Sequence, residues 1–133
     1  MDIRKYSAED EANIMKLLRT EGDEWICYWG KDSAEKFKKA LLNSIVYVAY
    51  EDGTLCGYLR SIDDNDFYIY ICDLLVDKRY RGRKIGQKLM EQVCLDYPDR
   101  TVYVMSDVDD FYTKKGYRRE GSIFEVKIPG GEN

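Results

Sequence analysis

Apolar residues recur every three or four positions in three stretches of the chain, which is the spacing of one face of an α-helix. The first stretch predicts a helix over roughly residues 8–20, directly after a capping-box pattern that begins at Ser7. A second helix is expected from Ser33, and a third begins near Ile85. The apolar positions are Ile14, Leu17 and Leu18 in the first helix, Phe37, Ala40 and Leu41 in the second, and Ile85, Leu89, Val93 and Cys94 in the third.

Between the second and third helices the pattern changes to runs of β-branched and aromatic residues, which favour strands. Ile45–Tyr50 and Thr54–Ile62 predict a hairpin, because the turn residues Glu51-Asp52-Gly53 separate them. Phe67–Val76 then predicts a long apolar strand. These three runs indicate an antiparallel meander.

The last part of the chain returns to mixed structure. Thr101–Met105 predicts a strand, and a short helix is expected to end near Gly116. Tyr117–Ile128 is expected to close the sheet as a final strand. The predicted order β-α-α-β-β-β-α-β-α-β indicates one α/β domain over residues 1–133.

The composition is that of a folded protein with an acidic surface. Of 133 residues, 44% are apolar and 35% charged, and 25 acidic against 21 basic residues give a net charge of −4, which argues against nucleic acid as the main partner. There is no His, so imidazole bases and His-liganded metal sites are excluded. The four Cys are widely spaced without a CxxC pair, so no metal or redox pair is expected. Without an apolar leader or a membrane-length stretch, we expect a cytoplasmic protein without a membrane partner.

The segment Asp77–Gly86 departs from the acidic average. Six Lys or Arg and one acid between Asp77 and Lys88 give this part of the chain a charge of +5. The segment follows a strand and opens a helix, whose first turn exposes unpaired N–H groups and the positive end of the helix dipole. Gly82 and Gly86 would let the backbone approach an anion, so the segment is a candidate phosphate site. The alternative is a solvated basic helix start, since neither the P-loop nor the dinucleotide fingerprint is present.

Two motifs stand in a fixed order. In the basic segment, Arg79 and Gly82 match the pattern [RQ]xxGx[GA], while Lys84 occupies the position where Gly or Ala is usual; further on, Phe111–Tyr117 matches FYxKxG[FY]. These are motifs A and B of the GNAT superfamily of acetyl-CoA-dependent N-acetyltransferases, which the chain resembles over essentially its whole length. The resemblance implies the GNAT-type acyl-CoA N-acyltransferase fold, an α/β (α+β) architecture. Its central sheet is mixed, mostly antiparallel, flanked by helices and splayed at the cofactor site.

The resemblance also implies acetyl-CoA as the cosubstrate and assigns residues to it. Loop N–H groups would hold the pyrophosphate, and the end of the preceding strand would pair with the pantetheine arm, because strand amides exposed by a splay need partners. The implied residues are Arg81, Gly82, Arg83, Lys84, Ile85 and Gly86 for the pyrophosphate, and Leu74, Leu75 and Val76 for the pantetheine.

The implied reaction, direct attack of an amine on the acetyl thioester in a ternary complex, needs two proton transfers. Tyr112 stands at the family position that donates a proton to the departing thiolate; the alternative is a core or substrate-wall aromatic. Phe111 is expected to be core, so that Tyr112 points elsewhere. For the general base, Asp73 is the best carboxylate, because an acid in an apolar strand requires an explanation. The alternative for Asp73 is a partner for a nearby Arg or backbone group.

A second candidate for the base, and for a wall of the acceptor site, is the pair Asp23 and Glu24 beside Trp25. The alternative there is a solvated loop. Acidic clusters away from the basic segment would steer a cationic amine. The acceptor stays open among polyamines, aminoglycosides, amino acids, peptide N-termini and lysine side chains.

The sequence therefore predicts an N-acetyltransferase that modifies a primary amine of a small molecule or peptide. One rival is a non-catalytic acyl-CoA-binding or regulatory domain with the same fold. Another is a nucleic-acid or phosphoprotein-binding domain that uses the basic segment alone. The apolar closing strand is a candidate homodimer interface.

Overall fold

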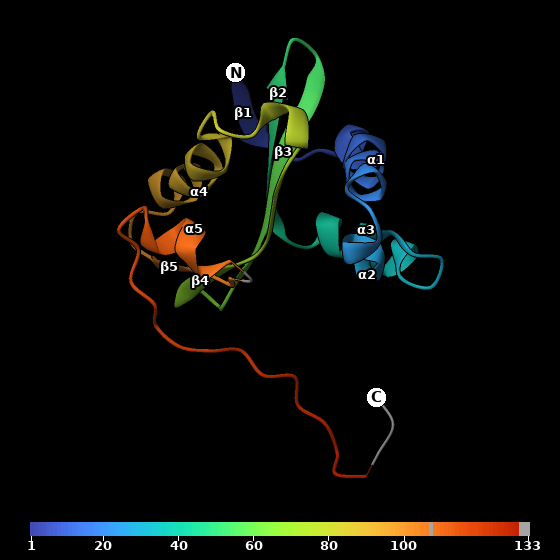
Figure 1. The fold of residues 1–133 in the computed structure, drawn as a ribbon. Helices are drawn as coiled ribbons and strands as arrows, with labels where there is room; N and C mark the ends of the chain where they lie inside the picture. Colours follow the sequence, from blue (N-terminus) through green and yellow to red (C-terminus); the bar gives the residue numbers. More distant parts are fainter. Residues whose placement is uncertain (107, 131–133) are drawn as a thin grey trace.

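A mixed five-stranded sheet, in the order β1-β2-β3-β4-β5, forms the centre of the computed structural model, which describes residues 1–106 and 108–130 (Figure 1). The first four strands pair antiparallel, and β4 and β5 pair in parallel. The strands are β1 (Asp2–Lys5), β2 (Ile45–Glu51), β3 (Thr54–Asp63), β4 (Tyr68–Val76) and β5 (Thr101–Val104). The expected class, a mixed and mostly antiparallel sheet flanked by helices, is confirmed.

Helices cover both faces of the sheet. One face is covered by α1 (Glu11–Glu21), α2 (Ile26–Trp29) and α3 (Ala34–Leu42), and the other by α4 (Ile85–Asp96), with α5 (Asp109–Thr113) beside it (Figure 1). Three single 3-10 turns, η1 (Ala8–Asp10), η2 (Asp23–Trp25) and η3 (Lys78–Tyr80), join these elements. The first predicted helix is thus a 3-10 turn followed by α1, and the expected capping box is present, because the Ser7 N–H donates to Asp10 at 2.8 Å.

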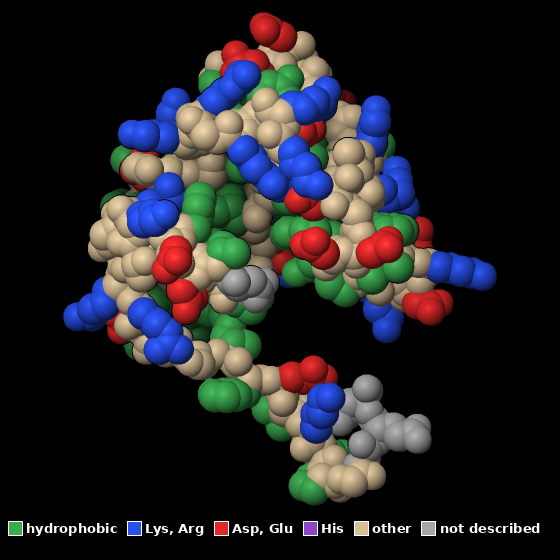
Figure 2. Space-filling view, viewed as in Figure 1, with side chains coloured by type: hydrophobic (Ala, Val, Ile, Leu, Met, Phe, Trp, Pro, Cys, Tyr) green, Lys and Arg blue, Asp and Glu red, His purple; other side chains and the backbone are tan. Residues whose placement is uncertain are grey.

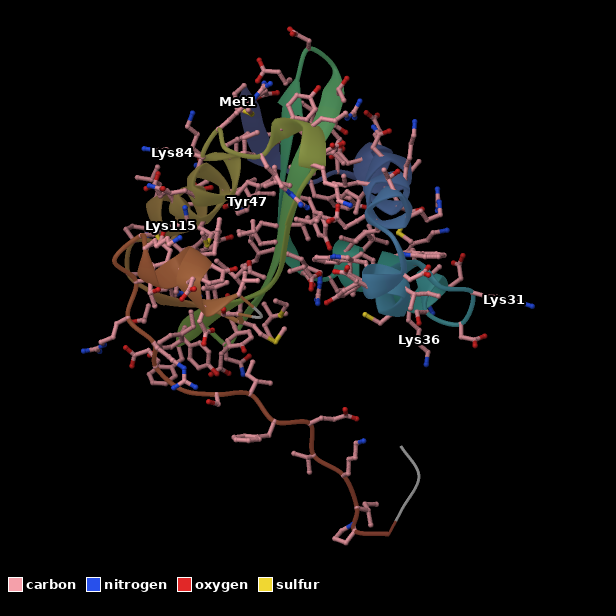
Figure 3. All side chains as sticks on the ribbon, viewed as in Figure 1. Met1, Lys31, Lys36, Tyr47, Lys84 and Lys115 are labelled. Carbon is pink, nitrogen blue, oxygen red and sulfur yellow. The ribbon has the colours of Figure 1, made fainter. Side chains whose placement is uncertain are left out.

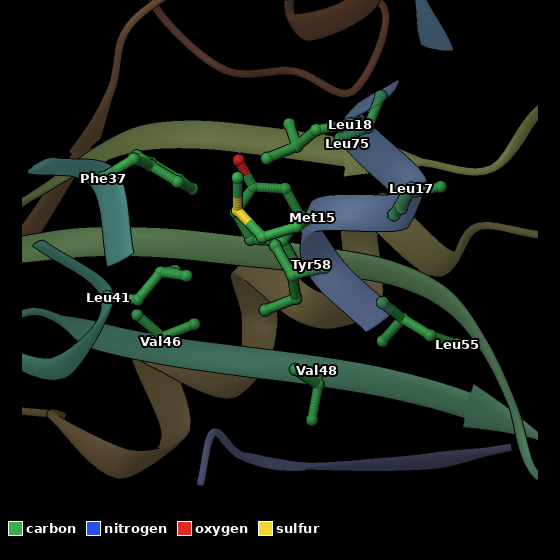
Figure 4. Close-up of a cluster of buried hydrophobic side chains, with 11 residues drawn as sticks. Met15, Leu17, Leu18, Phe37, Leu41, Val46, Val48, Leu55, Tyr58 and Leu75 are labelled. Atoms are coloured by element: carbon green, nitrogen blue, oxygen red, sulfur yellow. The ribbon is translucent and has the colours of Figure 1, made fainter. Parts of the chain in front are cut away.

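The sheet separates two buried clusters, as the alternating pattern of its strands requires. On the α1–α3 side, Leu18, Leu41 and Tyr58 lie in the first cluster (Figure 4). On the α4 side, Ile71, Leu89 and Val93 belong to the second cluster. Leu18, Leu41, Leu89 and Val93 come from the helical stripes predicted from the sequence, so the hydrophobic pattern explains which face of each helix is buried. Cys94, expected at the end of the last stripe, is instead exposed.

The expected closing strand is wrong. After Gly116 the chain runs extended away from the body (Figure 1), and residues 117–128 form no strand in the described structure. Phe124 and Val126 are 83% and 92% exposed. The local sequence of such a segment does not specify the strand edge with which it will pair. The outer edge of β5 has no strand beside it in the described part of the chain.

Candidate acyl-CoA site

β4 and β5 part before β4 ends. Their pairing runs from Tyr68 opposite Thr101 to Ile71 opposite Val104, and the Met105 N–H still donates to the Ile71 carbonyl at 3.1 Å. β4 continues to Val76, and no described strand lies beside Cys72–Val76 on the β5 side. Buried or half-buried strand amides need partners, so this gap is a place where an extended polar ligand can bind.

A β-bulge at the start of this gap reverses the faces of the sheet toward which the later side chains of β4 point. In the pairing with β3, Arg60 lies opposite Asp73 but Ser61 lies opposite Ile71, so Cys72 is an extra residue in β4. Ile71 therefore faces the α4 cluster, whereas Leu75 faces the α1–α3 cluster. Of the residues expected to contact pantetheine, Leu75 is buried, and Leu74 and Val76 are half-buried against the α4 side.

The basic segment leads from β4 to the start of α4 through two residues with positive φ. Gly82 has φ +84° and Lys84 has φ 62°, both in the left-handed region that favours glycine. Lys84 thus stands, in a strained conformation, where the motif usually has Gly or Ala. Lys84 is also the N-cap of α4, and its side chain makes no capping hydrogen bond. The first-turn N–H groups of α4 therefore lack a side-chain cap, which favours an anion at this point.

Two of the arginines in this segment are already paired. Arg79 folds back onto Asp77 at 2.9 Å. Arg81 forms an ion pair with Glu21 at the end of α1, at 2.7 Å, and its Nε donates to the Val76 carbonyl at 3.0 Å. Arg81 thus connects the basic segment with the α1 side of the sheet.

The remaining cations of the segment are available to a ligand. Within residues 1–106 and 108–130, no ion pair involves Lys78, Arg83, Lys84 or Lys88. Figure 2 shows Lys and Arg side chains gathered above a hollow with hydrophobic walls, and Figure 3 labels Lys84 at the start of α4. Uncapped N–H groups and unpaired cations together suit a phosphate or pyrophosphate.

Tyr112 lies on the other side of the gap, in α5. Its ring is half-buried against the α4 cluster and stacks with Tyr117 at a centroid distance of 6.4 Å. It lines a hollow of about 970 Å³ together with Ile71 and Met105, the residues at which β4 and β5 part. The expectation for its neighbour is wrong: Phe111 is 41% exposed, while Tyr112 is the residue that packs on the core. The buried and exposed positions of Phe111 and Tyr112 are thus exchanged relative to the sequence prediction.

Asp73 lies in the bulge, and its side chain is 1% exposed. Its Oδ2 accepts from Arg60 Nε at 2.6 Å and its Oδ1 from Arg60 Nη2 at 3.3 Å, while the Tyr58 hydroxyl lies 3.4 Å from Oδ2. Burial, and then the Asp73 carboxylate, raise the pKa of Tyr28 well above its usual value. Of the two roles that the sequence left open, the structure shows Asp73 as the partner of an arginine.

A comparison with protein families identifies the fold that this arrangement belongs to. A family model described as an acetyltransferase (GNAT) domain matches residues 42–119, which include β2 to β5, the basic segment and α5. The chain belongs to the GNAT acetyltransferase family. Its sheet and flanking helices match those of solved GNAT acetyltransferases.

Two solved structures and one curated relative illustrate the likeness. An aminoglycoside acetyltransferase, HMB0005 from an uncultured soil metagenomic sample, is 25% identical, with a TM-score of 0.72 over 96% of this chain and 97% of that one. An aminoglycoside 6'-N-acetyltransferase solved with coenzyme A is 20% identical, with a TM-score of 0.66 over 80% of this chain and 64% of that one, and shares the fold. Probable acetyltransferase TAP2 of Glycine max is 24% identical over 84% of this chain and 56% of its own length. The chain spans about half the length of the curated relatives it matches.

In this GNAT chain, the turn after α1 lies beside the same gap. Asp23 and Glu24 are exposed in η2, and Trp25 is half-buried with its ring 5.2 Å from that of Tyr28. Because Tyr28 interacts with Asp73, and Glu21 with Arg81, this turn is joined to both β4 and the basic segment. Whether Asp23 and Glu24 contact an acceptor stays a prediction.

Sequence reasoning missed three contacts of this GNAT site: those of Glu21, Tyr28 and Arg60. Only one of the three contacts, that of Arg60, could be predicted from a pattern in the sequence. Asp73 is the single charged residue of β4, and Arg60 is a charged residue in the neighbouring apolar strand, so the hairpin favours their pairing. The other two contacts join elements far apart in sequence.

None of the helices in the described residues is long and apolar enough to cross a membrane. Over the same residues, no group of three or more Cys, Asp or Glu side chains is placed to hold a metal ion.

Proposed function

We propose that this chain transfers an acetyl group from acetyl-CoA to a primary amine of a small molecule or peptide, by direct attack in a ternary complex. The observation that supports this proposal most directly is that two surfaces suited to parts of acyl-CoA follow one another without a break. The open edge of β4 at Cys72–Val76 leads to the uncapped N-terminus of α4 and its unpaired cations. A chain of amides ending in a pyrophosphate matches that order of surfaces, so the residues present suit acyl-CoA.

Each part of the path has a role in the proposal. The backbone of Leu74, Leu75 and Val76 pairs with the amides of the pantetheine arm. The N–H groups from Arg81 to Gly86 bind the pyrophosphate, and Arg83 and Lys84 add charge to it. The bound cosubstrate supplies an activated acetyl group as a thioester.

Tyr112 is the proposed general acid. When the amine nitrogen bonds to the acetyl carbon and the carbon–sulfur bond breaks, the Tyr112 hydroxyl donates its proton to the departing thiolate. Its place beside Ile71 and Met105, where the strands part, supports this role.

The amine must lose a proton before it attacks. Asp73 was the first sequence candidate for this step, but both of its oxygens accept hydrogen bonds from Arg60 and its side chain is 1% exposed, so the guanidinium rather than an amine occupies the carboxylate. We therefore propose Asp73 as a positioning residue that fixes β3 and Tyr28 at the bulge. The exposed carboxylates Asp23 and Glu24 attract the cationic amine, with water as the immediate proton acceptor.

A Tyr112→Phe variant tests the enzymatic claim against the rival, a non-catalytic acyl-CoA-binding domain. We expect thiol release from acetyl-CoA with a panel of amines to fall by about 10²-fold or more in kcat, the size of a general-acid contribution, with acetyl-CoA affinity unchanged. Tyr117→Phe removes a hydroxyl beside the same ring and is the matched control. No turnover by the unmodified chain with any amine, together with tight acetyl-CoA binding, would favour the binding domain.

A further inference from the structure

Glu21 occupies a position that its own helix does not favour. It is the last residue of α1, where the negative end of the helix dipole repels a carboxylate. Its side chain is 12% exposed, so little water surrounds the charge. Among the described residues its one ion-pair partner is Arg81, whose Nη2 lies 2.7 Å from Glu21 Oε1. The contact with the basic segment therefore accounts for an acid at this place.

Arg81 is also held at a second point. Its Nε donates to the carbonyl of Val76, the last residue of β4, at 3.0 Å. A guanidinium is a rigid planar group with five N–H donors, so two fixed contacts set the direction of the remaining donors. Within residues 1–106 and 108–130, no hydrogen bond involves Arg81 Nη1. Arg81 thus offers N–H groups whose direction is already set.

The Arg81 guanidinium lies where the two surfaces suited to acyl-CoA meet. A Cβ built on Gly86, in the first turn of α4, would lie 3.7 Å from Val76 Cγ2, so the end of β4 contacts the start of α4. Figure 1 shows the basic segment crossing the end of the sheet between α4 and α1. The remaining donors of Arg81 are therefore close to the uncapped N-terminus of α4.

We propose that Glu21 is a positioning residue of the acyl-CoA site, which holds the Arg81 guanidinium across the end of β4 with Nη1 free to donate to the pyrophosphate. Glu21 does not touch the cosubstrate, and its whole effect passes through Arg81. This inference rests on the proposed function, because it takes acetyl-CoA as the ligand.

Two opposing effects decide whether Glu21 strengthens or weakens the binding of acetyl-CoA. Its carboxylate repels a phosphate, but Arg81 is 47% exposed, so water and salt screen this repulsion across the guanidinium. A free arginine side chain loses its rotational freedom when a phosphate fixes it. With Glu21 in place, that freedom is lost before the ligand arrives, and such preorganisation favours binding. We therefore expect Glu21 to strengthen binding.

Titration calorimetry with acetyl-CoA measures this effect. Glu21→Ala removes the contact and should weaken binding by about tenfold, the effect of leaving one long side chain free. Glu21→Gln keeps an acceptor oxygen but makes a weaker, uncharged hydrogen bond, so its affinity should lie between those of the parent and Glu21→Ala. Glu11→Ala is the matched control, because Glu11 begins the same helix about 15 Å away and carries the same charge. It is expected to bind acetyl-CoA as the parent does.

A double-variant cycle shows whether Glu21 acts through Arg81. In an Arg81→Gln background, Glu21→Ala should cause no further loss of affinity. An undiminished tenfold loss in that background, or tighter binding of acetyl-CoA by Glu21→Ala and Glu21→Gln, would overturn the proposal. Circular dichroism selects a temperature at which all of these proteins are folded. The Glu21 variants should fold, because the exposed Arg81 guanidinium stays hydrated without its partner.

Heteronuclear NMR of the Arg81 Nε–H group gives a second readout that needs no ligand. We expect this group to exchange slowly with water in the parent and in Glu11→Ala, and faster in Glu21→Ala, where Arg81 is held at one point only. Acetyl-CoA binding by a parent whose Arg81 Nε–H exchanges freely would overturn the role of Glu21 and leave the proposed function intact. A protected Nε–H in a chain that does not bind acetyl-CoA would refute the proposed function, and with it the ligand assigned to Arg81.

Discussion

The ion pair between Asp73 and Arg60 gives the sharpest test of how this site is built. The Asp73 side chain is 1% exposed and that of Arg60 16%, and their closest atoms, Oδ2 and Nε, lie 2.6 Å apart. An Asp73→Asn substitution removes the negative charge and leaves the guanidinium in a largely buried place. We therefore expect a large loss of stability, because a buried charge without its partner is poorly solvated.

The size of this stability loss depends on the contacts that Arg60 keeps in the variant. Breaking a buried pair by removing one partner costs about 3–5 kcal/mol. Arg60 keeps a contact with the Ser44 hydroxyl at 3.4 Å and with the Phe37 ring at 5.5 Å, so the lower end of that range, about 3 kcal/mol, applies. For a chain of this size, such a loss corresponds to a fall in Tm of about 10 °C.

Equilibrium unfolding in urea, read by fluorescence and circular dichroism, measures the free energy. The Arg60→Met variant and the Asp73→Asn with Arg60→Met double variant complete a cycle, in which the double variant is expected to be more stable than Asp73→Asn. Glu120→Gln is a control, because the side chains of the Arg118–Glu120 ion pair are 86% and 45% exposed, and an exposed pair contributes little.

The same variants decide between a positioning role and a general base. As a positioning residue, Asp73 can be changed to Asn with a raised acceptor KM and an unaltered pH profile of kcat, measured at a temperature where the variant is folded. An Asp73→Asn variant within about 1 kcal/mol of the parent in stability, with kcat strongly reduced and the acid limb of its remaining pH profile lost, would refute this reasoning and restore Asp73 as the base.

Three further predictions concern stability and the basic segment. Burial alone would raise the pKa of the Asp10 carboxylate, but hydrogen bonds from Arg4 and its neighbours lower that pKa from 3.8 to about 2. The ionised carboxylate therefore stabilises the fold by about 2 kcal/mol above pH 4. This contribution is lost as the pH falls toward 2. Asp10→Asn should abolish that slope in unfolding measured against pH, and an unchanged slope would contradict the assignment. Gly57→Ala places a Cβ 3.1 Å from the Leu75 carbonyl oxygen and should cost about 1–2 kcal/mol in thermal unfolding, whereas equal or greater stability would show that β4 can move. Arg83→Gln removes the charge of an exposed side chain and should change stability by less than about 1 kcal/mol while weakening acetyl-CoA binding in calorimetry; unaltered affinity would remove the Arg83 charge from the site.

The sequence was sufficient for the features that depend on local periodicity. The β-branched and aromatic runs at Ile45–Tyr50 and Thr54–Ile62 define β2 and β3, and the helical stripes define α1, α3 and α4, because the buried face of a helix must be apolar at the helical period. The basic segment could also be predicted as an anion site, because its charged residues and its glycines are close together in the sequence. Gly82 has the positive φ that only glycine adopts easily.

What the sequence could not supply are pairings between distant elements. The pairing of Glu21 with Arg81 joins residues 60 positions apart, and no local pattern specifies such a contact. For Phe111 and Tyr112 the error has a similar cause, because which side of a five-residue helix is buried depends on where α4 and β5 lie. The prediction for the C-terminal segment failed for the same reason. Its sequence predicts a strand, but no local pattern specifies the strand edge with which it would pair.

Acetyl-CoA binding at the start of α4 is the central claim, and titration calorimetry of paired glycine variants tests it most directly. Gly82 and Gly53 both have positive φ, +84° and +79°, with no atom within 4 Å of a built Cβ, so a glutamate strains each backbone alike. Gly53 lies in the β2–β3 turn, away from the basic segment. We expect acetyl-CoA and desulfo-CoA to bind the parent and the Gly53→Glu variant, and to lose binding to Gly82→Glu, which places a carboxylate where the pyrophosphate is proposed to lie. Equal affinity for all three proteins, or no binding to the parent, would contradict the claim.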